Sequence, residues 1–141
     1  QNINKEKKMS DILQFSIPGK PEYVQMLRLA VGSAACKNGF DMEQTEDIKV
    51  AVEEACNLLT CHGREGFSEK YDLTVKIGDG KLEIIVSDLG SGHIPEKDGG
   101  HCKHCPQECD LAMFVMDSLM DEAELFNNES GSISIRMVKN K

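Results

Sequence analysis

Two segments of alternating apolar and polar residues, joined by Gly78-Asp79-Gly80, constrain the fold of this chain most strongly. Residues 71–77 and 82–86 place apolar side chains at every second position, which is typical of strands with one buried face. An Asp-Gly pair tolerates the positive φ angles of a two-residue turn. The sequence therefore predicts an antiparallel hairpin in the middle of the chain.

The segments around this hairpin predict three helices. The first begins at Pro21 and stops at Asn38-Gly39, and the second ends at His62-Gly63. Asp41 and Gln44 resemble a capping box at the start of the second helix, and a third helix is predicted over residues 111–119. The other segments are predicted as strands over residues 12–17, 124–126 and 132–138 and a loop over residues 87–106.

This order of elements predicts an α+β fold, a two-layer α/β sandwich with its helices on one face of a mixed, mostly antiparallel sheet. A length of 141 residues fits one domain. Residues 1–10 lack apolar periodicity and are expected to form a flexible N-terminal tail, so that the single domain covers residues 11–141.

The charge of the chain excludes several classes of partner. Its 24 acidic and 16 basic side chains give a net charge of −8, which disfavours binding to nucleic acid or to an anionic membrane. No apolar run approaches the roughly 18 residues of a membrane helix, and the polar residues 1–10 carry no export signal. We therefore expect a cytoplasmic protein whose six cysteines are reduced thiols or metal ligands.

Three motifs in this order resemble those of the bacterial anti-sigma factor serine/threonine kinases, which have the histidine-kinase and gyrase type of ATPase fold. They are the helix segment Glu46–Cys56, the Asp-x-Gly-x-Gly segment Ser87–Gly92 and the helix segment Met116–Glu122. The resemblance implies ATP and magnesium as cofactors and a lid loop over about residues 93–109. It also implies a role in transcription regulation: sequestering a sigma factor, phosphorylating a serine of a small antagonist protein, and forming a homodimer.

The resemblance also implies roles for single residues. Glu54 matches the catalytic carboxylate, which can accept the proton of the substrate hydroxyl; without the resemblance it would be an ordinary exposed helix glutamate. Asp88 matches the acceptor of the adenine amino group, and Gly90 and Gly92 let the backbone pass close to the base. Ser132 follows a glycine, as a threonine does near the last strand of the family.

The departures from the family pattern fall on the magnesium and phosphate motifs. Leu58 stands where the family has a magnesium-binding asparagine, and Asn57 could replace it only if the helix rotates locally. Asp110 and Ala112 stand where the family has a phosphate-binding Gly-x-Gly, and we expect the Asp110 carboxylate to cap the third helix in place of phosphate. From residue 98 to 129 there are eight acidic residues and one lysine. Kinase activity is therefore uncertain, and the alternatives are a non-catalytic regulator and an active serine kinase.

A cluster of cysteines and histidines occupies the predicted lid. Cys102 and Cys105 have the spacing of a zinc-binding pair, and Cys109 with His104 or His101 could complete four ligands. Free thiols or a redox-labile disulfide would explain the cluster equally well. A third alternative is therefore a metal- or redox-sensing module on this fold. The remaining cysteines are expected on helices, where they would fill the core: Cys36, Cys56 and Cys61.

Overall fold

The computed structural model describes residues 11–59, 70–88, 109–127 and 133–141. The predicted order of helices and strands is confirmed. The elements are β1 (Asp11–Pro18), α2 (Pro21–Lys37), α3 (Met42–Leu59), β2 (Lys70–Gly78), β3 (Lys81–Asp88), α4 (Cys109–Leu119), β4 (Glu122–Asn127) and β5 (Ile133–Asn140).

The five strands form one sheet in the order β1-β2-β3-β5-β4, and every neighbouring pair is antiparallel. The α+β sandwich is confirmed, whereas the sheet is antiparallel throughout its described part rather than mixed. β3 and β4 do run in the same direction, but β5 lies between them and pairs with both. Because the last strand lies between β3 and β4, these two strands make no parallel pair with each other.

The central hairpin forms at the predicted turn. Gly78 pairs with Lys81, so that Asp79 and Gly80 are the two turn residues. Their φ angles are 58° and 73°, the left-handed conformation that Asp and Gly tolerate best. This turn fixes the register of β2 on β3 and places their apolar side chains on the same face.

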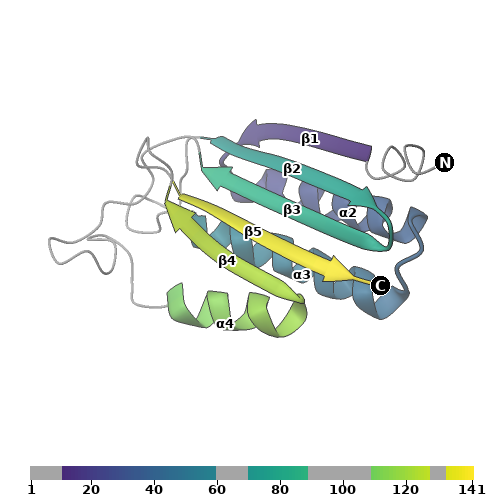
Figure 1. Ribbon diagram of the computed structural model, residues 1–141. Helices are drawn as coiled ribbons and strands as arrows, with labels where there is room; N and C mark the ends of the chain where they lie inside the picture. The colour runs from purple at the N-terminus through teal and green to yellow at the C-terminus, as the bar shows by residue number, and fades with distance from the viewer. Residues whose placement is uncertain (1–10, 60–69, 89–108, 128–132) are drawn as a thin grey trace, which may run out of the picture.

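The helices cover that apolar face of the sheet, and the opposite face is open in the described part of the chain (Figure 1). Alternate strand residues and one stripe of each helix are buried between the two layers. The largest fully buried side chains are Tyr71, Leu27, Ile48, Leu59, Leu73, Leu82, Ile84, Met116, Ile135, Met137, Val31 and Val52. This single core fixes how α3 and α4 lie on the strands.

The ends of the first two helices follow the local sequence. Pro21 occupies the first turn of α2, where a missing N–H leaves no bond unmade. After α2, Gly39 adopts a φ of +89° and its N–H donates to the Cys36 carbonyl over 3.2 Å. At the start of α3 the Gln44 N–H donates to Oδ1 of Asp41 (2.8 Å), and the Asp41 N–H donates to Oε1 of Gln44 (3.0 Å). The predicted capping box is thus confirmed.

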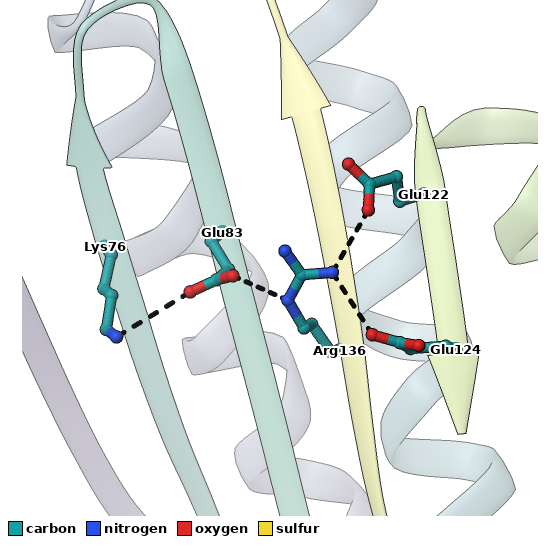
Figure 2. Close-up of polar contacts among 5 residues, drawn as sticks. All are labelled: Lys76, Glu83, Glu122, Glu124 and Arg136. Atoms are coloured by element: carbon teal, nitrogen blue, oxygen red, sulfur yellow. Dashed lines mark hydrogen bonds and ion pairs between the residues drawn. The ribbon is translucent and has the colours of Figure 1, made fainter. Parts of the chain in front are cut away.

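The open face of the sheet carries a network of charged side chains centred on Arg136 of β5 (Figure 2). Its Nε lies 2.6 Å from Glu83 of β3, and its Nη1 lies 3.2 Å from both Glu122 and Glu124 of β4. Lys76 of β2 adds a longer contact of 3.8 Å to Glu83. Four neighbouring strands are therefore joined on the solvent side by ion pairs as well as by backbone hydrogen bonds.

Candidate functional site

Helix α3 carries the predicted catalytic carboxylate. Glu54 is half-buried beside the buried stripe of Ala51, Val52 and Ala55. Leu58, one turn later, is only 9% exposed and belongs to the hydrophobic core. Consecutive helix residues differ by about 100°, and Asn57 accordingly points away from the core and is exposed. The turn after Glu54 thus offers an aliphatic side chain toward the interior and an amide toward solvent.

An ion pair joins α2 to α3 immediately before Glu54. Nη1 of Arg28 lies 2.6 Å from Oε1 of Glu53, and both side chains are only partly exposed. Sequence reasoning missed this pair, although a signal was present. Arg28 lies four residues after Val24 and three before Val31, within the buried stripe of its helix, and an arginine there requires an acidic partner.

The predicted adenine acceptor ends strand β3. Asp88 is 3% exposed and follows Leu82, Ile84 and Val86 on the face of the strand that the helices cover. It lies opposite Tyr71 of β2 in the register. A buried carboxylate therefore terminates an otherwise apolar row, and β3 extends two residues into the segment that was predicted as a loop from residue 87.

On the opposite face of the same strand end, two serine hydroxyls meet. Ser87 and Ser134 lie opposite each other in the pairing of β3 with β5, and their Oγ atoms are 2.7 Å apart. This bond ties the end of β3 to the start of β5, two residues after Ser132. It therefore fixes the position of the strand that follows the predicted Gly-Ser turn.

The elements that carry the candidate site converge at one end of the molecule. Figure 1 shows that α3 and β3 end, and that α4 and β5 begin, on the same side of the fold. Glu54 lies near that end of α3, and Asp88 is the last residue of β3. The predicted catalytic and adenine-binding residues are thus brought to a common end, although 34 positions separate them in the sequence.

The two positions that match the phosphate-binding glycines of the family lie inside helix α4. It begins at Cys109, so that Asp110 and Ala112 lie in its first turn, and Ala112 packs against the core. At the other end, Nζ of Lys139 donates to the Leu119 carbonyl and lies 3.3 Å from Oδ2 of Asp47. Lys139 thus provides a hydrogen-bond donor for a carbonyl at the C-terminus of α4 and joins that helix to α3. Sequence reasoning also missed these contacts, because the partners of Lys139 come from two other elements.

Several predicted site residues lie outside the described residues. They are Gly90, Gly92, Cys102, His104, Cys105 and Ser132, together with His101 and Cys61. Cys109 and Asp110 are placed in the backbone of α4, but their side chains are not described. Within the described ranges, no three His, Cys, Asp or Glu side chains form a group that could hold a metal ion.

Cys36 and Cys56, the two helix cysteines that the structure describes, do not share one environment. Cys56 is fully buried, as predicted, and burial together with the Glu53 charge raises the pKa of its thiol to about 12. Cys36, in contrast, is exposed, so the prediction that it fills the core is wrong. The buried stripe of α2 includes Ala35, and a residue one step further along the helix is rotated out of that stripe.

None of the helices that the structure describes is both long enough and apolar enough to span a membrane.

Comparison with known proteins decides the family. The model of the histidine kinase-like ATPase domain matches residues 17–139. This chain belongs to the histidine kinase-like ATPase family. Within it the relatives are RsbW proteins. The chain is 31% identical to serine-protein kinase RsbW of Bacillus pumilus over 93% of this chain and 88% of the relative. It is 33% identical to the same kinase of Listeria monocytogenes over 89% of this chain and 85% of the relative.

Solved structures agree with this membership at the level of the fold. The RsbU and RsbW domains of a Mycobacterium tuberculosis protein match with a TM-score of 0.66 at 14% identity. That match covers 92% of this chain and 32% of the longer mycobacterial chain. A chain of the SiaB–SiaC complex from Pseudomonas aeruginosa matches with a TM-score of 0.65 at 12% identity, over 97% of this chain and 94% of that one. The resemblance to anti-sigma factor serine kinases, which the sequence motifs carried, is confirmed as an RsbW relationship.

Proposed function

We propose that this RsbW-family protein is an anti-sigma-factor-like regulator in the cytoplasm, which acts by binding a sigma factor and an antagonist protein and has weak or no kinase activity. The observation that carries the proposal is the burial of Leu58 in the core, one helical turn after Glu54. As the resemblance implies, transcription regulation would follow from sequestering the sigma factor, and a homodimer is the expected assembly.

The magnesium ion fits this chain poorly. A hard cation requires oxygen ligands, and an aliphatic side chain at position 58 offers none. Asn57 has a suitable amide oxygen, but it is exposed on the other side of a helix that stays regular to Leu59. Moving Asn57 inward would turn the helix by about 100° and carry the buried Cys56 to the exposed direction that Asn57 now takes. Asn57 as a substitute ligand therefore remains the less favoured prediction.

The phosphate groups of ATP fit poorly for an electrostatic reason. Phosphates bind where backbone N–H groups at a helix start are free and the local charge is positive. In this chain the first turn of α4 carries Asp110, and residues 109–127 contain five acidic and no basic side chains. We propose that the Asp110 carboxylate takes the place of phosphate at this helix start.

An active, ATP-dependent serine kinase is the second candidate, and two observations favour it. Glu54 is half-buried on α3, where the resemblance predicts a general base, and Asp88 is buried at the end of β3, where it predicts an adenine acceptor. Gly90, Gly92 and Ser132 would complete the nucleotide site. These residues fit an adenine base better than they fit a magnesium-bound triphosphate.

Phosphoryl transfer from labelled ATP to the antagonist protein separates the two candidates. We expect no Mg-dependent transfer by the wild type, and unchanged binding of the antagonist by the Glu54→Gln variant. Leu58→Asn restores the family ligand and tests whether position 58 limits the reaction; Leu58→Met is its volume-matched control. Micromolar affinity for Mg-ATP by calorimetry, together with transfer that Glu54→Gln abolishes, would overturn the regulator proposal in favour of the kinase.

Zinc in the predicted lid is a separate proposal that rests on sequence alone. Cys102, Cys105, Cys109 and His104 would be its ligands. Metal analysis of the purified protein tests it directly. About one zinc per chain, lost on Cys102→Ser, would support the site, and less than about 0.2 equivalents would exclude it.

A further inference from the structure

The outer face of α4 presents large apolar side chains to solvent. Met116 and Met120 face the core and are buried, whereas Leu111 and Phe114 on the opposite side of the helix are 65% and 69% exposed. Residues three apart on a helix are neighbours on its surface. Among the described residues, only Met42 is a more exposed large apolar side chain than Phe114. Exposed aromatic and leucine side chains that lie together are typical of interaction sites.

The charge around these two side chains has one sign. The segment 109–127 holds five acidic residues and no lysine or arginine. Asp117, next to Phe114 on the helix surface, is exposed and is paired with no cation in the described part of the chain. Glu122 and Glu124 of β4 lie apart from this surface, on the open face of the sheet, where they share the guanidinium of Arg136, as Figure 2 shows. In the described part of the chain, the apolar patch is therefore bordered by the carboxylate of Asp117 and by no basic side chain of the segment.

We propose that this face of α4, formed by Leu111, Phe114 and Asp117, docks a basic amphipathic helix of a partner protein. Apolar side chains at helical spacing on the partner would cover Leu111 and Phe114, and a lysine or arginine beside them would pair with Asp117. The docking goes beyond the proposed function, because it needs neither a nucleotide nor Glu54, Leu58 or Asp88.

Charge complementarity selects this occupant over the alternatives. A second copy of the chain would bring the same acidic α4 against itself, and like charges at close range repel. An anionic lipid surface would be repelled in the same way, since the segment offers no basic side chain to the head groups. A basic helix gains from both parts of the surface: its apolar stripe loses contact with water and its cations find acceptors.

The probe is a fluorescein-labelled amphipathic peptide of about 18 leucine and lysine residues, long enough to form a helix on binding. Fluorescence anisotropy with the full chain measures its affinity. A second peptide with glutamate in place of lysine tests the charge requirement. We expect the lysine peptide to bind, with affinity that falls as salt rises, and the glutamate peptide not to bind.

The variants locate the binding surface. Leu111→Ser with Phe114→Ser should weaken binding roughly tenfold, because the apolar anchors are lost. Asp117→Lys should weaken it about threefold and reduce its salt dependence. The matched control is Met26→Ser with Leu29→Ser, a pair at the same spacing on α2 and similarly exposed, 61% and 65%; it should leave the affinity unchanged. Circular dichroism melting confirms that every variant is folded.

Two results would overturn the proposal. Equal loss of affinity in the α2 control pair would mean that the peptide binds any exposed apolar side chains. A wild-type dimer in light scattering that Leu111→Ser with Phe114→Ser converts to a monomer would assign this face to a second copy of the chain instead.

Discussion

Nη1 of Arg28 lies 2.6 Å from Oε1 of Glu53, and this ion pair joins α2 to α3 one residue before Glu54. Both side chains are partly shielded from water, so their attraction is screened less than that of a fully exposed pair. The Nε atom of Arg28 is buried and has no hydrogen-bond partner among the residues that the structure describes. The orientation of α3 near the candidate site is therefore linked to α2 by this ion pair as well as by the shared core.

We expect Arg28 and Glu53 to be energetically coupled. A double-mutant cycle with Arg28→Met and Glu53→Gln, measured by urea unfolding, should give a coupling free energy of about 1 kcal/mol. The exposed pair of Lys49 and Glu46 on the surface of α3 is the control and should show weaker coupling. If the two single variants and the double variant are strictly additive, the pair does not stabilise the contact between the helices.

The capping box at the start of α3 is expected to stabilise the fold measurably. Asp41→Ala removes the acceptor of the Gln44 N–H and should lower the free energy of unfolding by about 1 kcal/mol. Asp41→Asn keeps a side-chain acceptor and should retain most of that stability. Chemical denaturation measures both variants, and equal loss in the two would point to the charge of Asp41 rather than to its hydrogen bond.

Cys56 gives a prediction of pH dependence. Its thiol has a pKa of about 12 in the folded protein against an ordinary value of 9.0, because burial disfavours the thiolate. The folded pKa is the higher one, so below pH 9 the thiol is protonated in both states and contributes no pH dependence. Between pH 9 and 12 the unfolded state loses this proton first, and stability falls by about 1.4 kcal/mol per pH unit.

Comparison with a variant isolates this contribution. Cys56→Ala should show a shallower loss of stability between pH 9.5 and 11 than the wild type, whatever its stability at pH 7. Thiol labelling gives an independent readout, since exposed Cys36 should react in the native state while Cys56 reacts only after unfolding. Parallel stability curves for the two proteins would show that the Cys56 thiol does not titrate as described.

The network on the open face of the sheet depends on Arg136. The acidic side chains Glu83 and Glu122 hold the pKa of its guanidinium above the usual value, so the cation persists across the whole accessible pH range. Arg136→Met leaves the carboxylates of β4 close together without a cation and should cost about 1–2 kcal/mol in thermal or urea unfolding. Glu124→Gln removes only one exposed contact and should cost less than about 0.5 kcal/mol. A variant at position 136 as stable as the wild type would mean that strand pairing alone holds β4.

Much of the fold was predictable because its information is local. Alternation of apolar residues located the strands, the Asp79-Gly80 turn set the register of β2 on β3, and Asp41 with Gln44 marked the start of α3. The helix segment that carries Glu54 was likewise predicted, whereas Asp88, predicted at the start of a loop, is the last residue of β3. Each of these features depends on residues that are near neighbours in the chain.

Other features could not be predicted, because they depend on how distant elements meet. The insertion of β5 between β3 and β4 makes the sheet antiparallel, and nothing in the two strand sequences specifies that order. Lys139 contacts Asp47 and the end of α4, partners 92 and 20 positions away. A lysine in an alternating strand carries no local mark of such a contact.

The sequence by itself determined the family, the order of the elements and the hairpin that organises the sheet. Only the tertiary structure decided that Leu58 is buried while Asn57 is exposed, that Cys36 and Cys56 lie in opposite environments, and that Leu111 and Phe114 face solvent. The physical reason is that helical spacing defines the relative directions of side chains around an axis. Which of those directions is covered depends on the neighbouring elements that pack against the helix.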